Sequence, residues 1–273
     1  MKTDRYAVVG NPVAHSLSPE IHMAFAAQTG ESLSYERIEA PLDGFARTVE
    51  DILGGSGRGL NVTAPFKGEA AEWVGRLDPG AAFAQAVNTI VEDPLGGYVG
   101  FNTDGPGLVM DIERLLPGRT GLSVLLLGAG GAARGVVLPL LERIARSLTI
   151  ANRTEEKALV LAAKLSEAGH EAVEAAGFAT LGGGYDLVVN ATSAGLAGGV
   201  PAIPASAVAG AFCYDMVYGG DTAFMRWARS AGALGCADGL GMLVSQAALA
   251  FKLWRGVLPE VEPVRRALAD AGS

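Results

Sequence analysis

The stretch S-V-L-L-L-G-A-G-G-A-A-R, Ser123–Arg134, decides the fold of this chain. Its apolar residues Val124–Leu127 are typical of a parallel strand buried on both faces, and the small residues after them predict a tight turn into a helix. The spacing Gly128-x-Gly130-x-x-Ala133 fits the loop that holds a dinucleotide's diphosphate at a helix N-terminus. A glycine-rich turn in an ordinary strand-helix joint is the alternative, and the flanking strand and helix favour dinucleotide binding.

The next predicted strand ends in Ala151-Asn152-Arg153-Thr154, and Lys157 follows one helical turn later. An acidic residue here would bind the free 2′-hydroxyl of NAD, and this strand end has none. Arg153 can pair with a 2′-phosphate, Thr154 can cap the helix and donate to the same phosphate, and Lys157 adds positive charge. The pattern therefore predicts NADP(H) as cofactor. The alternatives are a helix start with solvated cations and a domain without a cofactor.

The composition limits the kind of protein. With 273 residues, of which 49% are hydrophobic, the chain can form one large domain or two modest ones. Its net charge of -8 argues against nucleic acid as a partner, because phosphate binding needs a basic face. Cys213 and Cys236 lack metal or redox spacing, and no apolar run reaches about 18 residues. We expect a cytoplasmic protein with free thiols that binds no membrane.

Strands and helices alternate along the chain, which predicts an α/β fold with two domains separated by a cleft. An N-terminal α/β substrate domain is expected over residues 1–104, completed by residues 240–273. A Rossmann-type NADP-binding domain is expected over residues 105–239. We place the last helices on the first domain because its short sheet needs more cover than its own helices provide.

Polar residues in the first domain fall at predicted strand ends and helix starts, where open α/β sheets bind their ligands. Hydroxyl and amide groups there suit a polyhydroxylated ring, and two serines near a helix N-terminus suit a carboxylate. Each residue alone has a structural alternative, such as an N-cap for Ser18 before Pro19. The residues in this set are Ser16, Ser18, Asn61, Thr63, Lys67, Asn88, Asn102 and Asp104.

Lys67 is the most informative member of that set, because an ammonium group at a helix N-terminus opposes the helix dipole. A lysine that points into water is the alternative. If Asp104 reaches Lys67, the pair supplies the positioned proton donor that hydride transfer to a ketone needs. We assign no catalytic role to His15, His22 or His170, and we expect no metal site because no ligand spacing is present.

Several motifs follow one another along the chain in a fixed order. They are Gly10–Pro19, Asn61–Lys67, Ala86–Thr89, Asn102–Asp104, Gly128–Ala132, Asn152–Lys157, Asn190–Ser193, Tyr214–Tyr218 and Gly239–Gln246. Together they resemble the shikimate dehydrogenases of the bacterial monofunctional type, and the resemblance covers essentially the whole chain. Two positions depart from the family pattern, Gln85 before Ala86 and Ala223 where a proline is common, and both concern loop shape.

The resemblance implies the reversible NADPH-dependent reduction of 3-dehydroshikimate to shikimate, a step in chorismate and aromatic amino-acid biosynthesis. It implies that Lys67 is the acid-base residue and Asp104 its partner. The implied substrate-binding residues are Ser16, Ser18, Asn61, Thr63, Lys67, Asn88, Asp104, Tyr218 and Gln246. The implied cofactor-binding residues are Gly128, Ala129, Gly130, Gly131, Ala132, Asn152, Arg153, Thr154, Lys157, Thr192, Met216 and Gly239.

Two alternatives to this function stay open in the sequence. One is a quinate/shikimate dehydrogenase of broader specificity, with NAD as an alternative cofactor. The other is a non-catalytic NADP-binding sensor, which would be expected to have lost Lys67 or Asp104. The sequence contains no long apolar surface that demands a partner, so we expect a monomer or a homodimer.

Overall fold

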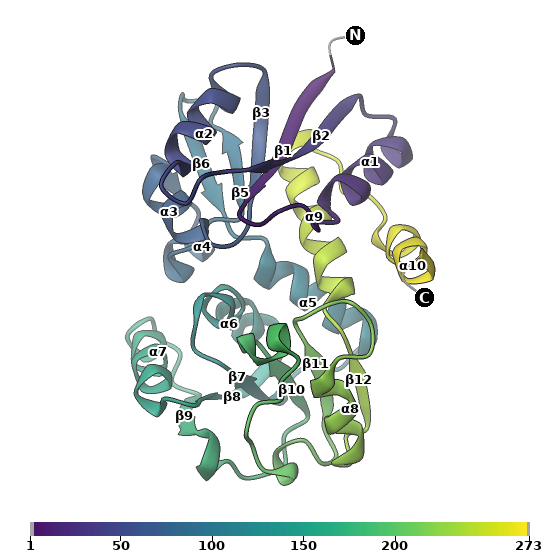
Figure 1. Cartoon of the computed structure of the whole chain (residues 1–273). Helices are drawn as coiled ribbons and strands as arrows, with labels where there is room; N and C mark the ends of the chain where they lie inside the picture. The colour runs from purple at the N-terminus through teal and green to yellow at the C-terminus, as the bar shows by residue number, and fades with distance from the viewer. Residues whose placement is uncertain (1–2, 272–273) are drawn as a thin grey trace. The chain divides into compact units, whose positions relative to one another are not determined.

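The computed structural model describes residues 3–271, apart from the side chains at 196 and 197. Contacts divide it into two compact units, one formed by the residues up to Gly107 with Val244–Asp270, the other by Leu108–Leu243. Both divisions fall inside a helix, α5 (Asp104–Leu115) and α9 (Leu240–Arg255). Figure 1 shows a sheet with helices packed on it in each unit. No helix in residues 3–271 is both long and apolar enough to cross a membrane.

The first unit is built on a six-stranded mixed sheet with the order β2-β1-β3-β5-β6-β4. β1 pairs in parallel with β2 and β3, whereas β5 is antiparallel to β3 and β6. Its strands are β1 (Asp4–Gly10), β2 (Leu33–Glu39), β3 (Gly57–Val62), β4 (Arg76–Leu77), β5 (Thr89–Glu92) and β6 (Tyr98–Phe101). Its remaining helices are α1 (Ser18–Thr29), α2 (Phe45–Leu53), α3 (Lys67–Trp73), α4 (Pro79–Ala84) and α10 (Val261–Ala271).

Helices cover both faces of this sheet, which explains the unbroken apolar run in β1. Alternate side chains of a strand point to opposite faces. Ala7 and Val9 belong to an apolar cluster with Phe45 of α2, and all three are fully buried. On the other face the ring of Tyr6 stacks on that of Trp254 in α9, with a centroid separation of 4.6 Å.

Helix α9 is fixed to the first sheet by specific contacts. The indole Nε1 of Trp254 donates a hydrogen bond to the backbone oxygen of Ile90 in β5 at 3.0 Å. A Cβ atom at Gly59 would lie 2.4 Å from that Nε1, so the strand approaches the indole where only glycine fits. Arg255 at the end of α9 forms ion pairs with Asp4 and Glu31. Residues from the two ends of the chain therefore stabilise one sheet.

The second unit contains a six-stranded parallel sheet with the order β12-β11-β10-β7-β8-β9. The glycine-rich loop joins the central strand β7 to α6, as the sequence predicted, and the α/β fold with a Rossmann-type unit is confirmed. The strands are β7 (Leu122–Leu127), β8 (Ala145–Asn152), β9 (Val173–Gly177), β10 (Leu187–Asn190), β11 (Phe212–Asp215) and β12 (Gly235–Ala237). The helices are α6 (Gly131–Arg143), α7 (Glu155–Glu167) and α8 (Ala223–Ser230), with short 3-10 turns at Phe178–Thr180, Ser193–Ala197 and Ala205–Ala207.

Candidate active site

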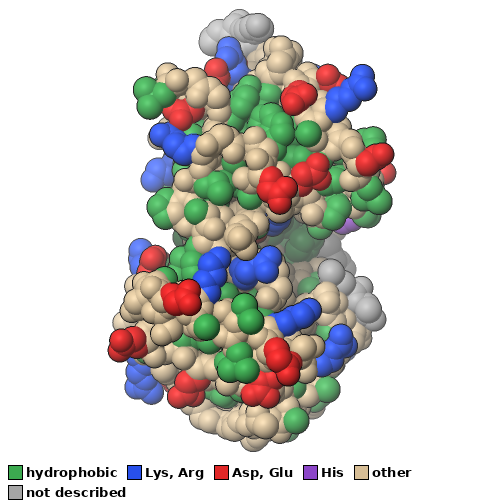
Figure 2. Space-filling model, turned by 90° about the vertical axis from the view of Figure 1, so that its left-hand side faces the viewer, with side chains coloured by type: hydrophobic (Ala, Val, Ile, Leu, Met, Phe, Trp, Pro, Cys, Tyr) green, Lys and Arg blue, Asp and Glu red, His purple; other side chains and the backbone are tan. Residues whose placement is uncertain are grey.

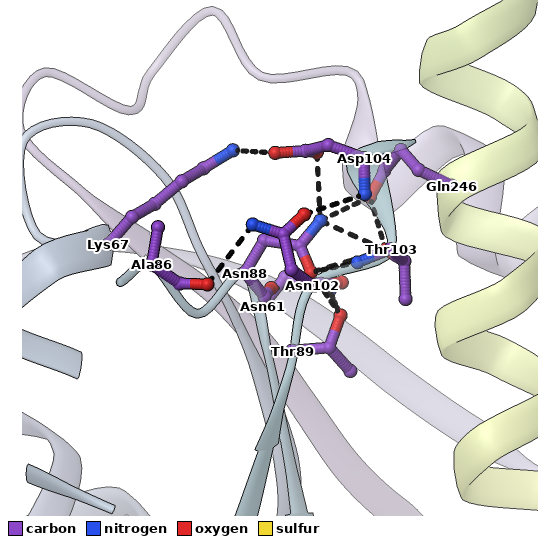
Figure 3. Close-up of polar contacts among 9 residues, drawn as sticks. All are labelled: Asn61, Lys67, Ala86, Asn88, Thr89, Asn102, Thr103, Asp104 and Gln246. Carbon is purple, nitrogen blue, oxygen red and sulfur yellow. Dashed lines mark hydrogen bonds and ion pairs between the residues drawn. The ribbon is translucent and has the colours of Figure 1, made fainter. Parts of the chain in front are cut away.

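Polar side chains that are distant in the sequence meet in the first unit (Figure 3). They come from the end of β3, the starts of α3, β5 and α5, the segment after β6, and the middle of α9. Hydrogen bonds and one ion pair link them into a single network. Its members are Asn61, Lys67, Asn88, Thr89, Asn102, Thr103, Asp104 and Gln246.

Lys67 and Asp104 form the ion pair of this network. The Nζ atom of Lys67 lies 2.6 Å from Oδ2 of Asp104. Each residue is the first of its helix, α3 for Lys67 and α5 for Asp104. The α5 dipole favours the carboxylate, and the carboxylate offsets the unfavourable position of the ammonium group at the start of α3. The Lys67 side chain remains 32% exposed, so its ammonium group is accessible to a small molecule.

Asn88 fixes the second oxygen of this carboxylate. It is 2% exposed, and its Nδ2 donates to Asp104 Oδ1 at 2.9 Å. Its own Oδ1 accepts from the backbone N–H of Thr103 at 2.9 Å, which sets the orientation of the amide. The backbone N–H of Asp104 donates to Asn102 Oδ1 at 3.1 Å. Both oxygens and the backbone of Asp104 are therefore held before any ligand binds.

Gln246 brings α9 into the network. Its Oε1 accepts hydrogen bonds from Asn88 Nδ2 and from Thr103 Oγ1, both at 3.4 Å. A Cβ atom at Gly107 would lie 2.7 Å from the backbone nitrogen of Gln246. Helices α5 and α9 thus touch at a glycine, and this close approach places Gln246 beside the residues of the sheet.

The structure places Asn61 behind the network, with its amide already occupied. Its Nδ2 donates to the backbone oxygen of Asn88 and to Thr89 Oγ1, both at 3.0 Å, and its Oδ1 accepts from the Tyr35 hydroxyl at 2.6 Å. Asn61 is 6% exposed. The ring of Tyr35 stacks on the buried ring of His22, with centroids 4.3 Å apart. The stacked rings of Tyr35 and His22 therefore support the polar network on the side of Asn61.

Ser16 and Ser18 lie together at the start of α1. The Ser16 hydroxyl donates to the Ser18 hydroxyl at 3.1 Å. The structural alternative for Ser18, a role as N-cap, was wrong, because α1 begins at Ser18 itself and Leu17 occupies the cap position. Arg37 pairs with Glu20 and donates to the backbone oxygen of Ser16 at 2.7 Å, which fixes the loop.

Two other predicted substrate residues differ in their surroundings. Thr63 follows β3, and a Cβ atom at Gly10 would lie 2.4 Å from its methyl carbon, so close packing holds this half-buried side chain. Tyr218 belongs to the second unit, where it follows β11. It is half-buried, and burial raises the pKa of its hydroxyl above the usual value. The phenol therefore stays protonated at neutral pH.

One large cavity, of about 690 Å³, lies in the second unit beside the glycine-rich loop. Its size is within the range typical of small-molecule sites. Apolar residues that the sequence analysis did not single out, including Phe178, Val200 and Pro201, complete its wall. The predicted cofactor residues that line the cavity are Gly128, Ala129, Gly130, Gly131, Ala132, Asn152, Arg153, Thr154, Lys157, Thr192 and Met216.

The glycines around this cavity permit close approaches of the backbone. Gly128 has a φ of +110°, and a Cβ atom there would lie 3.0 Å from the backbone oxygen of Ala191, which directly follows β10. Gly239 does not line the cavity, but a Cβ atom there would lie 2.3 Å from the backbone oxygen of Met216, which does. The N-terminus of α6 follows the loop directly, with Gly130 at its cap position. This arrangement fits a dinucleotide whose diphosphate lies on the helix N-terminus.

Two cations lie at the rim of the same cavity. Arg153 and Lys157 are exposed, and neither has an ion-pair partner within residues 3–271. Thr154 is the N-cap residue of α7, but its side chain makes no capping hydrogen bond, so this part of the sequence interpretation was wrong. Figure 2 shows several Lys and Arg side chains on one face of the second unit, with Asp and Glu side chains among them. A group with a free 2′-phosphate matches these unpaired charges.

Comparison with known proteins bears on this arrangement. Residues 8–90 match the family model for the shikimate dehydrogenase substrate binding domain. Residues 112–197 match the shikimate / quinate 5-dehydrogenase model, and residues 239–269 match the shikimate 5′-dehydrogenase C-terminal domain. A shikimate dehydrogenase (NADP(+)) of Hahella chejuensis is 52% identical, over 96% of this chain and 97% of its own length.

The chain belongs to the shikimate dehydrogenase family. Among solved structures of similar proteins, an Ael1 enzyme from Pseudomonas putida is 43% identical, with a TM-score of 0.92 over 97% of this chain and 98% of that one. A shikimate 5-dehydrogenase of Thermus thermophilus, solved with NADP(H) and shikimate, is 34% identical, with a TM-score of 0.86 over 98% and 99% of the two chains. The resemblance that the sequence motifs indicated is confirmed. The chain shares the fold of these two solved structures over nearly its whole length.

Several residues that support the site had no role assigned to them from the sequence. Tyr35 was not singled out, although it contacts Asn61. Asn190 and Asp215, the last residues of β10 and β11, were quoted only within motifs, yet both are almost fully buried. A polar residue at the buried end of a parallel strand is the signal that could have identified the last two.

Proposed function

We propose that Lys67 is the acid-base residue of a shikimate dehydrogenase and that Asp104 orients it. The enzyme uses NADP+ and belongs to the shikimate pathway. The reaction is the reversible reduction of 3-dehydroshikimate to shikimate. The observation that carries the assignment is the 2.6 Å ion pair between Lys67 and Asp104, held in place by Asn88.

The chemistry needs a proton and a hydride at one carbonyl group. When bound, NADPH supplies the hydride to the carbonyl carbon. The Lys67 ammonium group donates a proton to the carbonyl oxygen, which completes the alcohol, and it accepts that proton back in the oxidation. Asp104 accepts a hydrogen bond from the ammonium group and limits its motion, so that the proton donor is in place before the substrate arrives.

The substrate carboxylate and ring hydroxyls would bind to other residues of the first unit. Ser16 and Ser18 lie at the start of α1, where backbone N–H groups and hydroxyl groups favour an anion. We assign the ring hydroxyls to Thr63, Asn88, Asp104 and Gln246, with Tyr218 as a further substrate contact. Asn61 is a further proposed substrate residue, and its Nδ2 also supports Asn88 through a hydrogen bond to the Asn88 backbone oxygen.

The cofactor would occupy the cavity of the second unit. The loop from Gly128 to Ala132 would carry the diphosphate, and Arg153, Thr154 and Lys157 the 2′-phosphate. Asn152, Thr192, Met216 and Gly239 would border the rest of the molecule. The unpaired guanidinium group of Arg153 supports a preference for NADP+ over NAD+.

Initial rates of oxidation test this function. They are measured from the absorbance of the reduced nicotinamide, for shikimate and for quinate, with NADP+ and with NAD+ in turn. We expect strong preference for shikimate with NADP+. Comparable rates with quinate or with NAD+ would move the protein to the broader quinate/shikimate class. No rate with any pair, together with tight NADP+ binding, would favour a sensor and overturn the proposal.

The proposal also covers where the protein is located and how many copies of the chain associate. Cys213 and Cys236 are free thiols, and burial raises the pKa of Cys213 to about 12, which makes it a poor nucleophile. These properties support a protein of the reducing cytoplasm. We propose a monomer or a homodimer, and sedimentation equilibrium of the purified chain distinguishes the two.

A further inference from the structure

A buried chain of hydrogen bonds lies under the cofactor cavity, at the ends of two neighbouring strands. Asn190 ends β10 and is 1% exposed, and Asp215 ends β11 and is fully buried. The Nδ2 of Asn190 donates to Oδ1 of Asp215 at 3.1 Å. The Oδ1 of Asn190 accepts from the hydroxyl of Thr192 at 2.7 Å and from its backbone N–H at 3.2 Å.

The orientation of the Asn190 amide is fixed at both ends. A flipped amide would place its oxygen against the carboxylate of Asp215, and its NH2 group against the backbone N–H of Thr192. Both contacts would be repulsive, because a carboxylate only accepts and a backbone N–H only donates. The carboxylate is itself held, by the hydroxyl of Thr222 at 2.7 Å and the backbone N–H of Val217 at 3.3 Å. The amide oxygen of Asn190 therefore faces Thr192.

This orientation determines what the Thr192 hydroxyl can offer to a ligand. A hydroxyl group has one proton and two lone pairs. The proton of Thr192 is used in the hydrogen bond to Asn190. The side chain is half-buried and lines the cavity, so the group presents only an acceptor there. A ligand atom that meets this hydroxyl must be a hydrogen-bond donor.

The sheet order shows which half of a dinucleotide can supply that donor. β7 lies between β8, which Arg153 follows directly, and β10, which leads to Thr192. A dinucleotide lies across this point with its adenosine half over one side and its other half over the opposite side. The diphosphate oxygens are acceptors only, so they do not match Thr192. The nicotinamide half offers donors in its carboxamide N–H groups and its ribose hydroxyls.

We propose that Thr192 accepts a hydrogen bond from the nicotinamide half of the cofactor, and that Asn190, backed by Asp215, is the positioning residue that gives the Thr192 hydroxyl this polarity. The inference rests on the proposed placement of NADP+ in this cavity. It adds the requirement that the cofactor atom facing Thr192 is a hydrogen-bond donor, because the Thr192 hydroxyl can only accept a hydrogen bond there.

The experiment measures dissociation constants of the full chain by calorimetry, with three probes: NADP+, its 3-acetylpyridine analogue, and adenosine 2′,5′-bisphosphate. Thr192→Val should weaken NADP+ binding by about three- to ten-fold, the loss of one neutral hydrogen bond. It should leave adenosine 2′,5′-bisphosphate unchanged, whereas Thr192→Ser should bind NADP+ like the wild type. Thr149→Val removes a hydroxyl from β8 away from the cavity lining and is the matched control.

The acetylpyridine analogue, which has no carboxamide N–H, identifies the donor. If Thr192→Val weakens NADP+ binding but not analogue binding, the donor is the carboxamide. If both weaken equally, the donor is a ribose hydroxyl. Both results support the proposal. Unchanged NADP+ binding in Thr192→Val overturns it, as does an equal loss for adenosine 2′,5′-bisphosphate, which would indicate a general distortion.

The role of Asn190 is tested by a double-mutant cycle. Asn190→Ala should weaken NADP+ binding in the wild-type background and have no further effect in the Thr192→Val background. An equal effect in both backgrounds would indicate a purely structural role and overturn the assignment. If the wild type fails to bind adenosine 2′,5′-bisphosphate, the placement of the cofactor itself is wrong, which is a failure of the proposed function rather than of the polarity argument.

Discussion

The ammonium group of Lys67 lies 2.6 Å from the carboxylate of Asp104, although 37 positions separate the two residues in the sequence. The pair joins the first residues of two helices, and Asn88 holds its carboxylate from the other side. The proton donor of the proposed reaction is thus ordered by the protein alone. Substrate binding does not have to assemble it.

Replacing Lys67 tests the acid-base assignment. Lys67→Ala should lower kcat by about 10²- to 10⁴-fold, the usual contribution of a positioned general acid, and leave the dissociation constant of NADPH unchanged. Steady-state rates and NADPH fluorescence titration measure the two effects. Lys252→Ala, which removes an exposed lysine from α9, should behave like the wild type. Unchanged turnover in Lys67→Ala would contradict the assignment.

Removing Arg153 tests the cofactor preference. Arg153→Ala should weaken NADP+ binding by about ten-fold, because a charge-assisted hydrogen bond to the 2′-phosphate is lost at an exposed site. NAD+ binding should not change, since NAD+ lacks that phosphate. Calorimetric titrations with both cofactors give the ratio. An equal loss for both would show that Arg153 does not read the phosphate.

The buried His22 predicts a dependence of stability on pH. Burial lowers its pKa from 6.5 to about 3, so the unfolded chain binds a proton at a pH where the folded chain does not. Proton binding by the unfolded chain therefore lowers the free energy of unfolding below pH 6.5. This loss is absent above pH 6.5 and grows progressively as the pH falls from 6.5 toward 3. His22→Phe keeps an aromatic ring beside Tyr35 and removes the titration.

Urea unfolding of both chains at about pH 7.5 and about pH 5.5 measures this difference. The free energy of unfolding should fall by about 1.4 kcal/mol more in the wild type than in His22→Phe over this interval. Comparing the two chains removes the contribution of carboxylates that titrate in both. An equal fall in both chains would show that His22 is not the titrating group.

The contact between Gly107 and Gln246 predicts a loss of stability from one added methyl group. Gly107→Ala places a Cβ atom 2.7 Å from the Gln246 backbone nitrogen, which cannot rotate away. Overpacking of this kind costs about 1 to 3 kcal/mol. Thermal unfolding measures the loss, and a raised KM for shikimate should accompany it because Gln246 is displaced. Gly75→Ala, where nothing lies within 4 Å of the added atom, is the control.

The second unit could be predicted from the sequence because its signals are local. A continuous apolar run predicts β7, and the glycines after it predict the turn into α6. The short elements β4, α4 and β12 were not predicted, since two to six residues give no periodicity. α4 owes its start to Asp78, whose side chain accepts hydrogen bonds from two backbone N–H groups.

The site was predictable in its residue types and less so in their roles. Polar residues at strand ends identified the network around Asn88, because ligands bind at those ends in open sheets. Whether a side chain meets a ligand or supports a neighbour depends on hydrogen bonds between distant segments, as Tyr35 and Asn61 show. The direction in which the Thr192 hydroxyl donates its proton likewise depends on Asn190, whose amide is held by Asp215 of another strand. Such contacts are set by the folded chain and leave no spacing in the sequence.

The place of Gln246 in the polar network also has a consequence for protein synthesis. Gln246 follows Asn88 by 158 positions, and the whole second unit, Leu108–Leu243, is translated between the first unit's sheet and this residue. Domains generally fold as units while the chain is made. The residues of the Rossmann-type unit are therefore all synthesised before Trp254 and Arg255, which fix α9 to the sheet of the first unit. A chain that stops before α9 contains all six strands of the parallel sheet but lacks Gln246, and so lacks one member of the polar network.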